Sequence, residues 1–154
     1  ISRTIPVNGT FTDRQRELYD LVLTVQKKAI EKLVPGNTMK KYNEFVNKEM
    51  EREMIAIGLL KEHEVRNQDP GQPLFKKYFM HGTAHHLGLD VHDVFDKQRP
   101  FEPGMVFTCE PGIYIREEGI GIRIENNILV TENGPEDLSE HIPREAEDIE
   151  KMMK

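Results

Sequence analysis

Residues 105–131 read MVFTCEPGIYIREEGIGIRIENNILVT. Proline and glycine divide this stretch into short segments that are rich in β-branched and aromatic residues, which is typical of strands joined by tight turns. We predict strands at 105–110 and 112–116, and one or two more over 121–131. The stretch therefore indicates a small sheet of short neighbouring strands.

A first helix is predicted before these strands. Thr12 stands three residues before Gln15, which is the spacing of a capping box at a helix start. Pro35 and Gly36 would end this helix. Its apolar residues recur at steps of three and four and form one stripe: Leu18, Val22, Val25, Ala29 and Leu33.

A second helix is predicted over 39–57. Thr38 can cap its start, and Gly58 is a suitable residue for its end. The buried side of this helix would include four apolar positions, namely Phe45, Val46, Met50 and either Met54 or Ile57.

The remaining segments complete a single domain. Residues 67–74 carry two prolines and a glycine and are predicted to form a loop. Residues 143–153 are predicted to form a terminal helix with Pro143 in its first turn. Residues 1–7 alternate in polarity like the end of a strand. This order of elements predicts an α+β fold, in which helices cover one face of an antiparallel sheet.

The composition narrows the classes of protein that the chain can belong to. Its 154 residues carry a net charge of −6 without any cluster of lysine and arginine, which argues against a nucleic-acid partner. The single Cys109 excludes an internal disulfide and suits a reducing compartment, so we expect a cytoplasmic location. No apolar run approaches the roughly 20 residues of a membrane-spanning helix, so we expect no membrane partner. The chain begins with Ile1 rather than methionine, and we interpret it as part of a longer protein.

Histidines gather in one segment of the chain. Four of its six histidines, His81, His85, His86 and His92, fall within twelve positions. His81 and His85 have the spacing of zinc ligands on a helix, but Gly82 intervenes and the central glutamate of that motif is missing. An irregular strand or loop that passes close to a site is the better interpretation. A lone histidine is more often a packing or surface residue, but four together favour a site.

Two glutamates on the predicted strands are candidate partners for these histidines. Glu125 would share one strand face with Arg123 and Asn127, and the alternative is that this face is simply the solvated side of the sheet. Glu110 ends a strand just before Pro111, which fixes its direction, although it can equally be a surface residue of a turn. One histidine and two glutamates would suit Mn²⁺, Co²⁺ or Zn²⁺ rather than a thiolate-seeking metal.

Three blocks of the sequence resemble the successive signature motifs of a known family. They are HGTAHHLGLDVHD at 81–93, FTCEPGIY at 107–114 and GIGIRIENN at 119–127. Together they resemble the Xaa-Pro aminopeptidases, which belong with prolidase, methionine aminopeptidase and creatinase to the pita-bread-fold group. The opening segment 1–23 is similar to the family's sequence after its metal-binding aspartates, so the resemblance covers nearly all of the chain.

The resemblance implies a role for each matching residue. His85 and Glu110 would bind one of two metal ions, and Glu125 would bridge both. His81 and His92 would be catalytic histidines on the substrate side, where they would help to move protons or stabilise the tetrahedral intermediate. Arg123 would hold the acidic groups of the site in place. His86 stands where the family varies, so we expect it to serve packing.

The resemblance also implies an activity. A family member would use two ions, with Mn²⁺ expected and Co²⁺ or Zn²⁺ as alternatives, to cleave peptides whose second residue is proline. Two further aspartate ligands would precede Ile1, so we interpret 1–154 as the C-terminal part of a metallopeptidase catalytic domain, truncated on its N-terminal side. Alone, it would hold metal poorly or not at all and have little activity. We expect a homo-oligomer for the intact enzyme, and an unpaired strand edge in the fragment would favour pairing with another copy.

Two alternatives stay open. Prolidase, a dipeptidase of the same group, would carry similar motifs. A pita-bread domain without metal could instead bind peptides or proteins, but such a module should have lost the ligands that are retained here: His81, His85, His92, Glu110 and Glu125.

Overall fold

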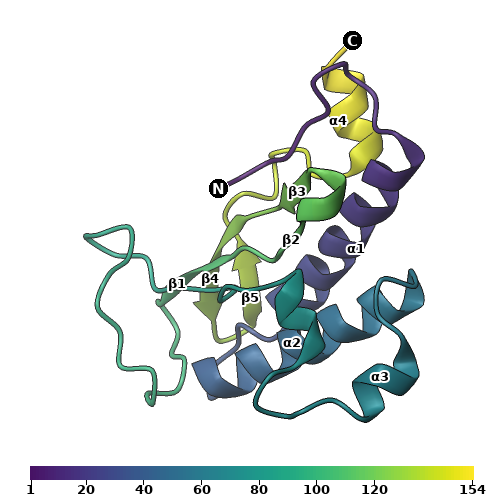
Figure 1. Ribbon diagram of the computed structural model, residues 1–154. Coiled ribbons are helices and arrows are strands. Elements are labelled where there is room, and N and C mark those ends of the chain that lie inside the picture. The colour runs from purple at the N-terminus through teal and green to yellow at the C-terminus, as the bar shows by residue number, and fades with distance from the viewer.

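The computed structural model describes residues 1–154 and has two long helices packed against small antiparallel sheets (Figure 1). Three strands form one sheet in the order β1-β4-β5, and β2 and β3 form a separate hairpin. The strands are β1 (Val106–Cys109), β2 (Gly112–Ile115), β3 (Ile120–Arg123), β4 (Asn126–Thr131) and β5 (Gly134–Asp137). The helices are α1 (Asp13–Ile30), α2 (Met39–Ala56), α3 (Glu62–Arg66) and α4 (Ala146–Met152), with 3₁₀ turns η1 (Leu74–Lys77) and η2 (Arg116–Glu118).

Local sequence signals determine where both long helices begin. The side chain of Thr12 accepts a hydrogen bond from the Gln15 amide, and the Gln15 side chain accepts one from the Thr12 amide, which confirms the predicted capping box of α1. Thr38 caps α2 in the expected way. Gly58 follows α2 with a φ of 72°, a left-handed conformation that favours glycine and ends the helix. Helix α1 ends at Ile30, a turn earlier than predicted from Pro35.

Strands β1 to β4 lie within or next to the predicted segments, but the ladder of hydrogen bonds between them is interrupted. Strands β1 and β2 are separated by Glu110 and Pro111, and β3 and β4 are separated by Ile124 and Glu125. Pro111 has no N–H to donate, so the pairing lapses at this point. One main-chain hydrogen bond, from the Ile124 amide to the Pro111 carbonyl at 3.3 Å, spans the gap. The expected single sheet is therefore divided into two, and the two glutamates lie at the division.

Three local expectations need correction. Residues 1–7 form no strand, because only Ser2 makes a bridge, to Glu125. The terminal helix begins at Ala146 instead of 143, since Glu145 is its cap. The short helix α3 and the strand β5 were not predicted; neither has the long apolar periodicity that makes an element visible in a sequence.

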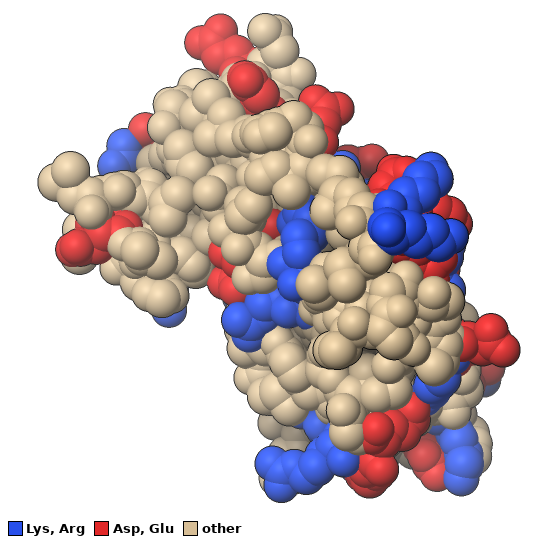
Figure 2. All heavy atoms as spheres, turned by 90° about the horizontal axis from the view of Figure 1, so that it is seen from above, with Lys and Arg blue, Asp and Glu red and all other residues tan.

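The core lies between the long helices and the sheets. The largest fully buried side chains include Leu18 and Tyr19 of α1, Tyr42 of α2 and Phe107 of β1. On the face seen in Figure 2, acidic and basic side chains lie interspersed. None of the helices combines the length and the hydropathy that a bilayer-spanning segment needs.

Candidate metal centre

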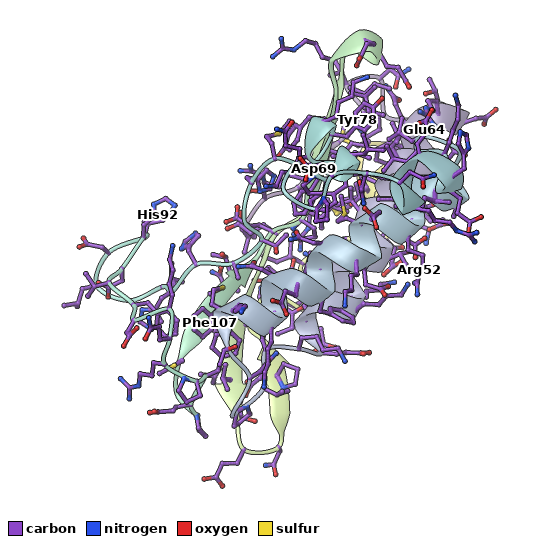
Figure 3. The ribbon with its side chains drawn as sticks, turned by 60° about the horizontal axis from the view of Figure 1, so that its bottom comes forward. Arg52, Glu64, Asp69, Tyr78, His92 and Phe107 are labelled. Atoms are coloured by element: carbon purple, nitrogen blue, oxygen red, sulfur yellow. The ribbon has the colours of Figure 1, made fainter.

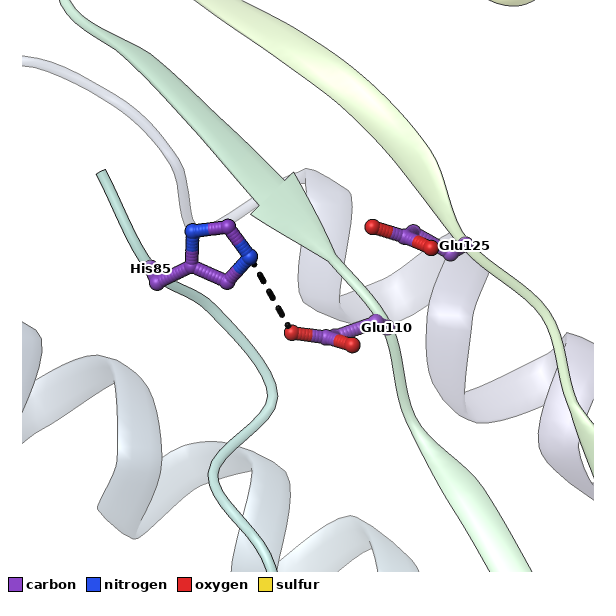
Figure 4. A group of neighbouring side chains, drawn as sticks. All are labelled: His85, Glu110 and Glu125. Atoms are coloured by element: carbon purple, nitrogen blue, oxygen red, sulfur yellow. Dashed lines mark ion pairs between the residues drawn. The ribbon is translucent and has the colours of Figure 1, made fainter. Parts of the chain in front are cut away.

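Glu110 and Glu125 face the same space at the division of the ladder. Cys109 at the end of β1 pairs with Asn126 at the start of β4, so the next residue on one strand and the preceding residue on the other lie side by side. Their side chains come from neighbouring strands (Figure 4) and are only 15% and 14% exposed. Carboxylates that lie so close and so nearly buried need a compensating cation or donors.

His85 reaches this space from the irregular segment that precedes β1. The His85 amide donates to Thr108 Oγ1 at 3.0 Å, and the His85 carbonyl accepts from the Thr108 amide at 3.0 Å. The Glu110 amide donates to the Thr83 carbonyl at 2.8 Å. The segment therefore runs along the free side of β1 as an irregular strand. An irregular strand or loop that passes close to a site is what the glycine-flanked histidine motif predicted. One ligand atom from each of His85, Glu110 and Glu125 lies within 4.8 Å of the others.

The hydrogen bonds of His85 define which of its nitrogens is free. Its Nδ1 lies 3.1 Å from the His86 carbonyl, which can only accept, so Nδ1 carries the proton in the neutral ring. The lone pair of Nε2 then points toward Glu110, whose Oε1 is 3.6 Å away, beyond hydrogen-bond range. An imidazole lone pair and two carboxylates aimed at one point are all electron donors. This donor set fits a divalent cation.

Two hydroxyl groups support the carboxylates. Ser2 Oγ donates to Glu125 Oε2 at 2.5 Å, and Thr108 Oγ1 lies 3.4 Å from Glu110 Oε1. The bond from Ser2 leaves Oε1 of Glu125 available to a cation, and Thr108 contacts the same Glu110 oxygen that faces His85 Nε2. Such contacts orient metal ligands and are a regular part of metal sites.

Tyr114 joins two of the predicted catalytic residues. His81 Nδ1 lies 2.7 Å from the Gly82 carbonyl and therefore carries the ring proton, so Nε2 accepts a hydrogen bond from the Tyr114 hydroxyl at 2.9 Å. Arg123 Nε donates to the same hydroxyl oxygen at 2.9 Å. Arg123 Nη1 also lies 3.7 Å from Glu110 Oε2. Two hydrogen bonds thus run in series beside the carboxylates, from the Arg123 guanidinium to the Tyr114 hydroxyl and from that hydroxyl to the His81 imidazole.

The sequence did not identify Tyr114 as a site residue. Its ring lies over two glycines, Gly112 on its own strand and Gly121 on the paired strand. A Cβ at position 112 would lie 2.7 Å from the Tyr114 hydroxyl and 2.9 Å from the Ile122 carbonyl, and one at position 121 would lie 3.2 Å from the ring. Glycines both beside and opposite an aromatic residue on a hairpin are the sequence signal that could have identified it.

His92 lies on a loop that projects from the body of the chain (Figure 3). Its ring centroid is 4.3 Å from that of His85, although the residue is otherwise exposed. The neighbouring Asp93 makes no hydrogen bond to this imidazole. Asp93 instead closes the loop by accepting hydrogen bonds from the amides of Leu89 at 3.0 Å and Val94 at 2.9 Å.

His86 packs against aromatic side chains. Its ring stacks on Phe95 with a centroid distance of 5.6 Å and meets Phe107 edge-on at 5.5 Å. Its Nδ1 is buried without a hydrogen-bond partner. These aromatic contacts agree with the packing role that we expected for it.

Comparison with known proteins tests the resemblance seen in the sequence. The sequence model of Metallopeptidase family M24 matches residues 1–132. The chain belongs to this family. Members of family M24 are metallopeptidases, so the family and the arrangement of His85, Glu110 and Glu125 both point to divalent metal ions.

Curated relatives agree with the assignment to family M24. The chain is 47% identical to the Xaa-Pro aminopeptidase of Haemophilus influenzae and 41% identical to that of Escherichia coli, in each case over 99% of its length. It covers 38% and 37% of those two proteins, so it spans little more than a third of their length.

Solved structures of aminopeptidases share the fold. A zinc-substituted aminopeptidase P of Escherichia coli, in complex with product, superimposes with a TM-score of 0.86 at 41% identity, over 98% of this chain and 37% of that one. The aminopeptidase PepP of Pseudomonas aeruginosa gives 0.87 at 34% identity, over the same shares. The chain therefore has the pita-bread fold, in the form of its C-terminal portion, as predicted.

Proposed function

We propose that this chain forms one side of a dinuclear metal site, in an aminopeptidase that hydrolyses the bond between an N-terminal residue and a penultimate proline. The observation that carries the proposal is the convergence of His85, Glu110 and Glu125, whose ligand atoms lie within 4.8 Å of one another. The names of the Haemophilus influenzae and Escherichia coli relatives support the substrate class.

The three converging residues would hold the ions through His85 Nε2 and the two carboxylates. Mn²⁺ is the ion that we propose, with Co²⁺ and Zn²⁺ suited to the same nitrogen and oxygen donors. Such ions, when bound, supply a water molecule whose pKa is lowered toward neutrality. Thr108 and Ser2 keep the carboxylates directed at the site through their hydroxyl groups.

The hydrogen-bonded series Arg123–Tyr114–His81 would transfer protons and orient the substrate. Arg123 donates a hydrogen bond to the Tyr114 hydroxyl, which in turn donates one to His81 Nε2. When the hydroxyl shifts its hydrogen bond to a substrate carbonyl, the lone pair of His81 Nε2 would be free to take up the proton released by the attacking water. His92 would approach the substrate from its exposed loop. A penultimate proline has a fixed φ and no N–H, so a site shaped for its ring discriminates sterically.

We further propose that residues 1–154 are the C-terminal part of a longer catalytic domain in the cytoplasm, and that the intact enzyme is a homo-oligomer. The share of the relatives that the chain covers, 38% and 37%, supports the first of these proposals. Three ligands would bind one ion weakly, so the chain alone should turn over substrate slowly or not at all.

Titration calorimetry with MnCl₂ tests the site directly. We expect weak binding of Mn²⁺ to the chain, and the loss of that binding in His85→Gln. His63→Gln is the matched control, because His63 lies on the exposed helix α3. Equal binding by all three proteins would refute the site.

Peptide assays separate the candidate functions. In the longer protein that would hold this chain, hydrolysis of both dipeptides and longer peptides with proline second supports an aminopeptidase. Cleavage of dipeptides alone indicates prolidase, and binding without cleavage indicates a non-catalytic module. Robust turnover by residues 1–154 alone, with added Mn²⁺, would contradict the predicted inactivity of the isolated chain.

A further inference from the structure

A buried polar cluster lies directly behind the two carboxylates of the site. Cys109 and Asn126 are partners across β1 and β4, and both are fully buried. Because neighbouring residues of a strand point to opposite faces, these two side chains face the core while Glu110 and Glu125 face the site. Contacts that fix the positions of Cys109 and Asn126 therefore also restrict the backbone of Glu110 and Glu125, which adjoin them.

Asp137 of β5 fixes the side chain of Asn126. Asn126 Nδ2 donates to both Asp137 oxygens, at 2.9 and 2.7 Å, and Arg144 Nη1 donates to Asp137 Oδ2 at 2.9 Å. The side chain of Asp137 is 11% exposed and that of Arg144 is 22% exposed. The arginine thus holds the carboxylate, and the carboxylate holds the asparagine next to Glu125.

Gln26 of α1 connects this pair to the strand that ends at Glu110. It is fully buried, and its Nε2 lies 3.4 Å from the Cys109 carbonyl and 3.5 Å from Asn126 Oδ1. Arg144 Nη1 reaches Gln26 Oε1 at 3.5 Å. One amide therefore bridges the residue before Glu110 and the residue after Glu125.

An ion pair that is largely removed from water, such as Asp137 with Arg144, is a weak means of stabilising a fold, since apolar residues of similar volume are often as stable. A network of this kind can instead specify one geometry. We infer that Asp137, acting through Asn126, is a positioning residue that fixes where Glu125 stands relative to Glu110, with Gln26 setting the spacing of the two strands. The inference deepens the proposed function and rests on it for the identity of the ligand.

Asp137→Asn tests the inference. The variant keeps the volume of the side chain but removes one acceptor for Asn126 and the charge that Arg144 holds. We expect the affinity of the chain for Mn²⁺, measured by calorimetry, to fall by about 10-fold or more, as for other residues that support metal ligands. Tyr19→Phe is the matched control, because the Tyr19 hydroxyl donates to the Arg144 carbonyl at 2.8 Å without contacting Asn126. Urea unfolding of both variants separates positioning from stability.

A reciprocal variant provides the rescue. Asn126→Asp alone would place two carboxylates against each other and should weaken Mn²⁺ binding. Asn126→Asp combined with Asp137→Asn restores one donor and one acceptor across the same contact, and should recover much of the affinity. If Asp137→Asn loses no more affinity than Tyr19→Phe, or if its loss only follows its unfolding free energy, the inference is wrong. If Asp137→Asn does not fold, Gln26→Met takes its place with the same criteria.

A readout without metal separates this inference from the proposed function. In protein labelled with ¹³C at glutamate carboxylates, the Glu125 signal of the metal-free chain should shift or broaden in Asp137→Asn and stay in place in Tyr19→Phe. Failure of the wild-type chain to bind Mn²⁺ would overturn the proposed metal site, and the carboxylate signal would still decide the positioning. An unchanged Glu125 signal in Asp137→Asn would overturn the inference.

Discussion

The hydroxyl of Tyr114 lies 2.7 Å from the position that a Cβ at Gly112 would occupy. A residue with a side chain at position 112 therefore displaces the phenol that links His81 to Arg123. Because the Ile122 carbonyl is also within 2.9 Å, moving the phenol alone would not relieve the contact.

We predict that Gly112→Ala is destabilised by about 1–3 kcal/mol, the usual cost of an overpacked site. Urea unfolding measures the effect. Gly82→Ala is the control, since a Cβ there would meet nothing within 4 Å. Equal unfolding free energies of the two variants would contradict the prediction, because they would show that β2 and β3 can shift to accommodate a Cβ at position 112.

Tyr114→Phe should leave the fold intact and release His81. The ring remains over Gly112 and Gly121, but Nε2 of His81 and Nε of Arg123 lose their common partner. A loss of about 0.5–1.5 kcal/mol in unfolding free energy is expected for the hydrogen bonds. In ¹⁵N NMR of the imidazoles, Nδ1 of His81 should keep its proton in both proteins because the Gly82 carbonyl still accepts it, and the Nε2 resonance should shift in the variant, where no hydroxyl donates to it. If the His81 resonances were no more changed than those of His63, the hydrogen bond from Tyr114 to His81 would be contradicted.

Gly88→Ala should disturb the loop of His92 while leaving the core unaffected. A Cβ at Gly88 would lie 1.9 Å from Asp93 Oδ2, the atom that accepts from the Leu89 amide. Hydrogen exchange at Leu89 and Val94 should accelerate, and the unfolding free energy should change little because the loop is exposed. Asp93→Ala should open the loop in the same way, and adding Gly88→Ala to it should have no further effect. Additive effects of the two changes would argue against the contact.

The chain should lose stability in alkali. Burial raises the pKa of the Cys109 thiol to about 12, and burial likewise raises that of the Tyr19 hydroxyl to about 12. Both groups ionise more readily in the unfolded chain, so their contribution to stability is complete below about pH 9 and is lost as pH rises toward 12. Urea titrations from pH 8 to 11 measure this slope. Cys109→Ala should flatten it, and a slope unaffected by that change would contradict the assignment.

The native thiol should also resist modification. Cys109 is fully buried, and only the thiolate reacts with alkylating reagents. Iodoacetamide labelling at pH 8 should therefore proceed only as fast as the chain opens, and should accelerate in urea in parallel with unfolding. Rapid labelling without urea would show that β1 opens locally.

Features encoded by neighbouring residues were predictable from the sequence. The starts of α1 and α2 follow from Thr12 and Thr38, whose caps act within one turn. The alternation of polarity along residues 122–128 correctly separated the buried isoleucines from Glu125. The family motifs predicted His85, Glu110 and Glu125 as metal ligands, and the structure brings these three residues together.

Features that depend on register between distant segments could not be predicted. Whether Glu125 meets Glu110 depends on the pairing of Cys109 with Asn126, which no local signal specifies. The contacts of Gln26 and Asp137 involve residues from four parts of the chain, so neither residue has a sequence pattern that distinguishes it. The role of Asp93 could not be predicted either, because a carboxylate close to a histidine in sequence can bond the amides of its own loop instead.

The hydrogen bonds that hold His85 to β1 end at Leu87, whose amide donates to the Val106 carbonyl at 2.9 Å. The exposed turn at 96–100 lies beyond them, on the far side of the aromatic contacts around Phe95. Insertions at this turn should thus leave the imidazole in register. Lengthening the chain there offers a way to attach a probe or a second domain while the segment that holds His85 stays in place.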